Sequence, residues 1–331
     1  MSSNPNQAPD TFHSYVFGGT HLDGDRLTFQ YKIYQPSFEK IIELVLGTEY
    51  GLGTRIEQGL KPAPIRILDA GCGEGLFLYY LAGLLEQRGL FNPATVQLIG
   101  IDSDTSAIAT ALDFVRTAQP TRPYLQFICY DLTKPFDLNP ELRPMLPLPA
   151  TLSEAAGDGG QEGGGGFDFI YAHLVAEHIP NASQHVKHWY SLLKPGGIIF
   201  LRDAVLDEGP NGWKAAHPAL APFASQVTQY IKQINGFNVS EVAKDWLNEW
   251  GAEQVQALPL VLPVGGDSQI GLMMLRNLVM IVRNSLPQLI AKNITTMAQG
   301  EALLELLFKE LSPQCIGSSA HLDTLARKPL A

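Results

Sequence analysis

Apolar residues in the middle of the chain fall into short blocks, which are separated by longer stretches with helical spacing. Five blocks rich in β-branched and aromatic residues predict strands, at residues 65–70, 96–102, 125–131, 167–173 and 197–203. Helical spacing covers the stretches between them, at residues 76–90, 105–118 and 186–193. This alternation is typical of a doubly wound α/β fold, a mostly parallel sheet with helices on both faces.

Helical patterns continue on both sides of this core. Residues 24–46 are amphipathic, and Pro36 is expected to divide them into two helices. Beyond the fifth strand, the pattern predicts helices at 240–250, 268–289 and 301–311, and strands at 254–264 and 322–327. The helix at 268–289 is apolar almost all round and should be buried. Its methionines suit core packing, and they could also line a substrate cavity or a dimer seam; they are Met273, Met274 and Met280.

Residues 139–166 break the alternation. They contain several prolines and then the run GDGGQEGGGG. Such a composition cannot bury enough apolar surface to order itself. We expect a flexible surface insertion here, either a tolerated loop or a mobile lid.

Composition narrows the classes of function. Hydrophobic residues make up 45% of the 331 residues and charged residues 17%, which is enough apolar surface for a core. The net charge of -10 disfavours nucleic acid as a partner. No apolar stretch reaches the ~20 residues of a membrane span, and no secretory signal is present. Three scattered cysteines argue against a disulfide framework or a metal site. These features predict a soluble cytoplasmic protein.

A glycine-rich segment, DAGCGEG at residues 69–75, lies between the first strand and the next helix. Glycines at such a turn let the backbone come close to a ligand, and the N–H groups at the helix start favour negative charge. The dinucleotide-binding fingerprint G-x-G-x-x-G is absent in both possible registers. Its last glycine is replaced by Leu76 when the motif is started at Gly71 and by Leu78 when it is started at Gly73. No Lys-Ser/Thr pair follows, so a P-loop fails as well. An acidic residue followed by G-x-G-x-G remains.

This segment resembles motif I of class I S-adenosylmethionine-dependent methyltransferases, in particular small-molecule enzymes of bacterial and fungal natural-product pathways. Further motifs follow in order: Asp102 at the end of the second strand, YDL at 130–132, FDFIYAHLVAEHIP at 167–180 and LLKPGGIIFLRD at 192–203. The resemblance covers residues 64–203 and implies a Rossmann-like methyltransferase fold. It also implies S-adenosylmethionine as cofactor, with S-adenosylhomocysteine as product.

The resemblance further implies a domain plan. Residues 1–59 would form an N-terminal tail and a helical lid over the cofactor, and residues 60–331 the methyltransferase domain with helical C-terminal additions. Within that domain, residues 204–250 would cover the substrate. Trp213 and His217 would there form an aromatic wall or pack at the surface.

The resemblance implies a cofactor contact for each residue of this sequence that matches a family motif. Asp69 would orient the loop and the methionine amino group, Asp102 would hold the ribose hydroxyls, and Asp131 would bind the adenine edge. The full set implied is Tyr15, Gln30, Asp69, Gly71, Gly73, Asp102, Ser103, Asp131, Leu132, Ala172 and His173. Ordinary interpretations compete with these roles: a tight turn for the glycines, helix capping for Asp102 and turn formation for Asp131.

Methyl transfer is a displacement at a sulfonium carbon, favoured by proximity, alignment and exclusion of water. A neutral amine or a thiolate needs little more, whereas a phenol, a hydroxyl or a carbon acid needs a base. His173 and His178 are the catalytic candidates, and Glu177 lies beside them in the sequence. Packing or a helix start is the competing interpretation for His178. Asp203, at the end of the fifth strand, is a further residue at the mouth of the site.

We therefore expect methyl transfer from S-adenosylmethionine to a small, apolar natural-product acceptor in secondary metabolism. The sequence is compatible with a homodimer but does not require one. One alternative keeps the cofactor but uses its charge for a cyclisation or rearrangement without methyl transfer. Another is a non-catalytic regulator of secondary metabolism. Demethylated cofactor among the products would separate the first two, and a stable protein partner without turnover would favour the third.

Overall fold

A seven-stranded sheet forms the centre of the protein. The computed structural model describes residues 21–58, 64–90, 92, 95–118, 124–146, 165–205, 220–309 and 317–330. The sheet has the order β3-β2-β1-β4-β5-β7-β6. Its strands are β1 (Ile65–Ala70), β2 (Val96–Asp102), β3 (Leu125–Cys129), β4 (Phe167–His173), β5 (Leu193–Ala204), β6 (Glu253–Val264) and β7 (Gly317–Arg327). Only the pairs of β7 with β5 and β6 are antiparallel. The doubly wound, mostly parallel sheet is confirmed.

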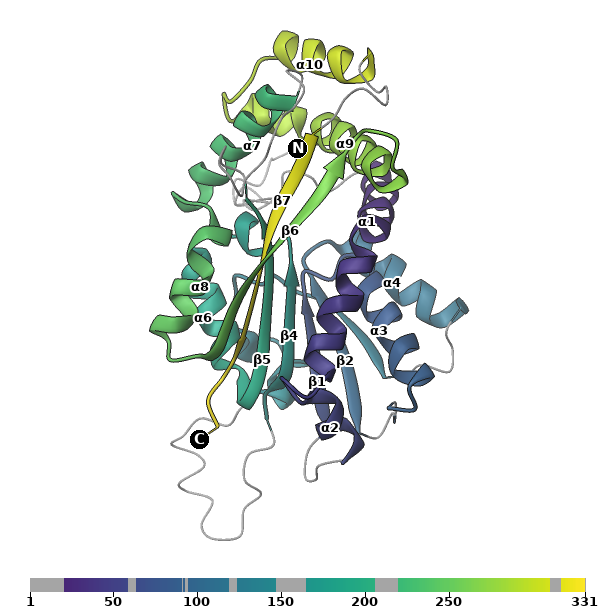
Figure 1. Cartoon of the computed structure of the whole chain (residues 1–331), viewed down its shortest axis with the longest axis vertical. Helices are drawn as coiled ribbons and strands as arrows, with labels where there is room; N and C mark the ends of the chain where they lie inside the picture. The colour runs from purple at the N-terminus through teal and green to yellow at the C-terminus, as the bar shows by residue number, and fades with distance from the viewer. Residues whose placement is uncertain are drawn as a thin grey trace, which may run out of the picture.

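Helices cover both faces of this sheet (Figure 1). One face packs against the apolar sides of α1, α3, α4 and α9, and the other against α6 and α8. The helices are α1 (His21–Leu46), α2 (Leu52–Glu57), α3 (Leu76–Gln87), α4 (Thr105–Ala118), α6 (Ala182–Ser191), α7 (Leu220–Asn235), α8 (Val239–Glu249), α9 (Gln269–Ala291) and α10 (Met297–Lys309). Short 3-10 turns are η1 (Phe136–Leu138), η2 (Arg143–Met145) and η4 (Ala176–His178). In Figure 1, α7, α9 and α10 gather at the top, where β6 ends.

The expected break at Pro36 is wrong, because α1 continues through it. A proline inside a helix costs about 3 kcal/mol or more, since one hydrogen bond is lost and the ring clashes with the preceding turn. Around it, Ile33, Tyr34 and Phe38 are almost fully buried against the core. Burying a large apolar side chain contributes roughly 1.5–3 kcal/mol, so these contacts outweigh the local penalty.

Two other segments also differ from the expectation. Helix α7 was not predicted, although Tyr230 and Ile231 on it are buried. Of the expected insertion at 139–166, residues 139–146 form a packed turn rather than a flexible stretch. Leu142 is fully buried, and the side chain of Asn139 accepts its backbone N–H at 3.1 Å. Residues 147–164 lie outside the described part of the chain.

A buried carboxylate fastens the amino end of the parallel strands. Asp168, near the start of β4, accepts hydrogen bonds from Lys194 Nζ at 2.6 Å and from the backbone N–H of Arg66 at 2.9 Å. Arg55 of α2 adds a third, from Nη1 at 3.2 Å. The cluster therefore ties α2, β1, β4 and β5 together at the end of the sheet opposite to the glycine-rich loop.

Candidate functional site

The strand order reverses between β1 and β4, and ligands of doubly wound sheets bind beyond the carboxyl ends of the strands at such a point. Ala70 pairs with Ala172, so the next residues, Gly71 and His173, continue from the sheet side by side. The predicted glycine loop and the predicted fourth-strand motif thus meet at one place.

The glycine loop has a left-handed backbone at three positions. The φ angles are +81° at Gly71, +51° at Gly73 and +77° at Gly75. A Cβ at Gly71 would lie 2.3 Å from Val175 Cγ2, so the chain after β4 packs directly on the loop. A Cβ at Gly73 would meet only Leu27 of α1, at an ordinary contact distance of 3.5 Å. The close approach that requires Gly71 is therefore to the protein's own chain.

Asp102 is fixed by backbone donors. Its Oδ2 accepts the N–H of Gly73 at 2.8 Å, and its Oδ1 accepts the N–H of Asp104 at 2.9 Å. A carboxylate offers about four acceptor positions, so these two bonds do not use its full acceptor capacity. Helix α4 is capped by Asp104 instead, whose Oδ1 accepts the N–H groups of Ser106 and Ala107. The capping interpretation of Asp102 therefore does not hold.

Asp69 lies buried beneath the same loop. Burial raises its pKa well above the usual value, and the nearby charge of Asp102 adds to the effect. Burial also raises the pKa of Asp102, while the backbone N–H donors oppose that shift. Two carboxyl groups in such a setting are stabilised in their charged form by a cationic ligand group.

Asp131 forms a turn. Its Oδ1 accepts both the N–H and the hydroxyl of Thr133, at 2.9 and 2.7 Å, and Lys134 Nζ lies 3.9 Å from its Oδ2. Leu132 is buried in the core on the far face of the sheet, whereas Ser103 is exposed beside β2. The turn interpretation of Asp131 is thus satisfied by the geometry, and one oxygen of its carboxylate faces only a distant lysine.

His173 lies among aromatic rings. The ring centroid of Tyr34 is 4.6 Å from its imidazole and that of Phe38 is 5.1 Å away, both edge-on. Its Nε2 is buried and has no hydrogen-bond partner among the residues that the structure describes. Burial, and then the charge of Arg202, lower the pKa of His173 well below its usual value. The imidazole is therefore neutral, and it is a weak base.

His178 and Glu177 are held inside the fold. Burial, with a smaller effect from Arg26, lowers the pKa of His178 to about 3. Glu177 Oε1 lies 3.4 Å from His178 Nε2, and its Oε2 accepts the N–H of Ala204 at 3.0 Å. Burial raises the pKa of Glu177 well above its usual value, and that of Asp203 to about 7. Asp203 Oδ1 accepts the backbone N–H of Glu177 at 3.1 Å, so this pair fastens η4 to the end of β5.

The predicted contacts from the N-terminal segment are only partly described. Gln30 lies on α1, and its Oε1 accepts a hydrogen bond from Arg26 Nη1 at 2.6 Å. Tyr15, Trp213 and His217 lie outside the described residues.

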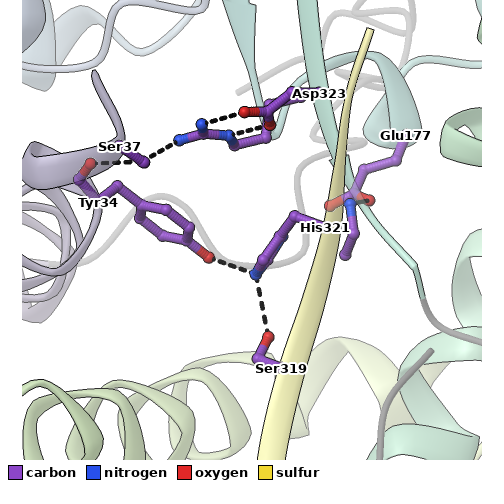
Figure 2. A network of polar contacts seen from close by, with 8 residues as sticks. Tyr34, Ser37, Glu177, Ser319, His321 and Asp323 are labelled. Atoms are coloured by element: carbon purple, nitrogen blue, oxygen red, sulfur yellow. Dashed lines mark hydrogen bonds and ion pairs between the residues drawn. The ribbon is translucent and has the colours of Figure 1, made fainter. Parts of the chain in front are cut away.

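A polar network beside this site was not found from the sequence (Figure 2). Arg202 Nε and Nη2 donate to the two oxygens of Asp323 at 2.5 and 2.6 Å, and Nη1 donates to Ser37 Oγ at 2.8 Å. Tyr34 Oη and Ser319 Oγ both lie within hydrogen-bond distance of His321 Nε2, at 2.8 and 3.0 Å. Burial, followed by Arg202, lowers the pKa of His321 to about 3.

Strand register brings this network to the site. Arg202 of β5 stands opposite His173 of β4 on one side and opposite Asp323 of β7 on the other. A signal was present, because an arginine interrupts an apolar strand at 202 and polar residues alternate at 319, 321 and 323. Alternation places such residues on one face of a strand.

Neither a metal site nor a membrane-spanning helix is present in the described part of the chain. No group of three or more His, Cys, Asp or Glu side chains there could hold a metal ion. None of the helices described is both long and apolar enough to cross a membrane.

Comparison with known proteins gives one family. A family model described as a methyltransferase domain matches residues 49–253. A search among curated proteins finds no sequence match.

Solved structures share the fold at low identity. Haemonchus contortus phosphoethanolamine N-methyltransferase 2, bound to phosphomonomethylethanolamine and S-adenosylhomocysteine, is 15% identical, with 86% of this chain and 53% of that chain covered and a TM-score of 0.43. The YcgJ protein of Bacillus subtilis is 16% identical, with 85% and 99% covered and a TM-score of 0.46. The [4+2]-cyclase SpnF is 17% identical, with 86% and 82% covered and a TM-score of 0.42. None of these likenesses is close enough to carry an activity over.

Proposed function

The chain belongs to the methyltransferase domain family, and we propose that it binds S-adenosylmethionine and transfers the methyl group to a small natural-product acceptor in secondary metabolism. The cofactor supplies an electrophilic carbon on a positively charged sulfur. In the transfer, the bond from that sulfur to the methyl group breaks as the bond to the acceptor forms. S-adenosylhomocysteine leaves, and the proton of the acceptor passes to solvent.

The observation that carries this proposal is the position of Asp102. Its carboxylate is anchored to Gly73 and Asp104 by backbone N–H groups, and its remaining acceptor capacity would serve the ribose hydroxyls of the cofactor. Hydrogen bonds to a charged group contribute about 1.5–3 kcal/mol each. The raised pKa of buried Asp69 supports the same interpretation, since the cationic amino group of the cofactor would restore its charged form.

The chemistry expected of the protein is mainly placement. His173 and His178 are neutral and weak bases because both are buried near arginine. Catalysis would then come from alignment and exclusion of water rather than from a strong protein base.

Calorimetric titration of S-adenosylmethionine and S-adenosylhomocysteine tests the proposal. Both should bind, and Asp102→Ala should weaken binding by roughly ten- to a hundredfold, the value of one charged hydrogen bond. Asp113→Ala, which removes an exposed carboxylate from α4, is the matched control and should leave binding unchanged. No binding by the unaltered protein, or equal binding by Asp102→Ala, would reject the cofactor assignment.

Turnover then decides the chemistry. Formation of S-adenosylhomocysteine in step with a methylated acceptor is expected. An acceptor that is converted while S-adenosylmethionine is recovered intact would show the cyclisation or rearrangement alternative instead.

A further inference from the structure

The acceptor side of the site contains unsatisfied polar atoms inside an apolar wall. His173 Nε2 and His321 Nδ1 are buried without a hydrogen-bond partner among the described residues. Both rings lie edge-on to Tyr34, with centroid distances of 4.6 and 5.1 Å. Buried polar groups in native proteins are nearly always hydrogen-bonded, so an orphaned imidazole nitrogen beside a ligand site suggests that the ligand supplies its partner.

The position of His173 favours a role in binding the acceptor. It follows Ala172, which pairs with Ala70 at the start of the glycine loop, and it stands opposite Arg202 in the direction away from β1. Phe38 and Tyr34 of α1 cover it with aromatic edges. Apolar walls with a few well-placed polar groups are typical of sites for small organic molecules.

The charges around His173 cancel. Arg202 is fully buried, its guanidinium donates to both oxygens of Asp323 and to Ser37, and the rings of Tyr34 and Phe38 lie 5.5 and 5.4 Å from it. Three of the five N–H donors of this arginine are therefore engaged within the protein, and its charge is compensated by Asp323. The negative charge of Asp323 is likewise compensated by Arg202, so it does not favour binding of a cation.

Burial disfavours the charged forms of Glu177, His173 and His321 as well. Burial raises the pKa of Glu177 well above its usual value, and burial lowers the pKa values of His173 and His321. A neutral imidazole in a neutral, aromatic setting can form a hydrogen bond with a hydroxyl group, as donor or as acceptor. It cannot compensate the charge of a carboxylate or an ammonium group.

We propose that His173 Nε2 forms the binding site for the hydroxyl of an uncharged, phenol-type acceptor, packed against Tyr34 and Phe38. This inference rests on the proposed methyl-transfer function, whose substrate class it names. It concerns recognition of the acceptor only: the base that a phenol requires is not assigned to His173, whose imidazole is a weak base. Because the charges around His173 are compensated, we expect acidic and cationic acceptors to bind more weakly.

Four probes with one ring system test the charge requirement on the full chain saturated with S-adenosylhomocysteine. They are 2-naphthol, 2-methoxynaphthalene, 2-naphthoate and 2-naphthylmethylammonium. By calorimetry, 2-naphthol should bind, and the other three should bind about tenfold more weakly or worse. Equal or tighter binding of any of those three would overturn the proposal. So would failure of 2-naphthol to bind up to its solubility limit.

A matched pair of variants tests the nitrogen itself. His173→Phe keeps an aromatic ring without nitrogen, and it should weaken 2-naphthol binding about tenfold. His188→Phe is the control, because His188 on α6 also has a buried, unpartnered Nε2 but packs on Phe136, away from this site. It should leave 2-naphthol binding unchanged. Unchanged binding by His173→Phe would overturn the proposal.

The two proposals can fail separately. Binding of S-adenosylhomocysteine is measured first, and its absence rejects the proposed function alone. The probe series is then run on the free protein, where the same ranking of probes is expected and a different ranking rejects the acceptor site. If His173→Phe does not fold, the comparison of 2-naphthol with 2-methoxynaphthalene on the unaltered protein decides.

Discussion

Arg202 and Asp323 form a two-pronged ion pair between neighbouring strands, with N···O distances of 2.5 and 2.6 Å. The two residues stand opposite each other in the antiparallel pairing of β5 with β7, and both are buried. Since Ser37 of α1 receives the third donor of the guanidinium, one arginine connects the sheet to the helix above it. The pair therefore holds the position of α1 as well as the register of the strands.

Removing one member of this pair should cost far more than removing both. Asp323→Ala leaves the guanidinium of Arg202 buried without its counter-charge, which typically destabilises a protein by about 3–5 kcal/mol. The double variant Arg202→Met/Asp323→Leu should lose much less, because no buried charge remains. Urea unfolding measures both. Glu43→Ala, which breaks a solvent-exposed pair with Arg88, should change stability by less than about 1 kcal/mol. An equal loss in the single and double variants would contradict this account.

Gly71→Ala should destabilise the protein for two separable reasons. A left-handed alanine costs roughly 1–2 kcal/mol, and its Cβ would lie 2.3 Å from Val175. Gly236→Ala has a similar φ of +77° but nothing within 4 Å, so it should show the backbone cost alone. Adding Val175→Ala to Gly71→Ala should recover the steric part only. The prediction fails if Gly71→Ala and Gly236→Ala have the same unfolding free energy.

Asp203 makes the stability of the protein depend on pH in an unusual direction. Its pKa is raised to about 7 in the folded protein because it is buried, and it is near 3.8 when exposed. The folded state therefore holds a proton that the unfolded state releases, and this stabilisation is full below pH 3.8. It is lost as the pH rises towards 7.

Asp203→Asn should accordingly gain stability relative to the unaltered protein as the pH rises from 4 to 7. The gain should be of order 1–4 kcal/mol, at 1.36 kcal/mol per pKa unit. The asparagine oxygen can still accept the N–H of Glu177, and the contributions of the buried histidines cancel. Because the charge of Asp203 also raises the pKa of Glu177, the measured difference belongs to these two carboxyl groups together. Urea unfolding at several pH values measures the difference. A constant difference across this range, as expected for the exposed control Asp113→Asn, would refute the assignment.

The cluster around Asp168 should affect stability without affecting ligand binding. Asp168→Ala removes the acceptor of Lys194, Arg55 and the backbone of Arg66, and two partly exposed cations lose their counter-charge. We expect a loss of roughly 1–3 kcal/mol in unfolding free energy. Affinity for S-adenosylhomocysteine at a temperature where the variant is folded should stay unchanged, because the glycine loop lies at the other end of the strands. Weakened binding in the folded variant would show coupling along the sheet.

The elements that the sequence predicted best are those in which local pattern and tertiary burial agree. Strands β1, β2 and β4 and helix α4 begin and end where the pattern places them, because apolar runs there are bounded by glycine or polar residues. Helix α1 shows the opposite case. Pro36 signals a break in the local sequence, and only the burial of its neighbours, such as Tyr34, against the sheet keeps the helix continuous.

The candidate site also has one part that the local sequence predicts and one part that depends on tertiary contacts. The glycine loop and Asp102 lie within about thirty residues of each other and form a local motif, so the sequence could predict them. The acceptor side depends on contacts between distant positions. Tyr34 and His321 are 287 residues apart, and nothing near either of them in the sequence indicates the other. The cap at Asp104 and the turn at Asp131 are different, because each is made with a residue two positions away and follows the local sequence.

The place of β7 in the sheet has a consequence for synthesis. This strand follows all the others in the sequence, yet it lies between β5 and β6. Because a chain leaves the ribosome from its N-terminus and domains begin to fold as it emerges, the glycine loop can assemble while β6 still lacks its neighbour. Until residues 317–327 appear, Arg202 has no counter-charge and Tyr34 has no imidazole beside it. A nascent chain would thus gain its glycine loop early and the proposed acceptor side last.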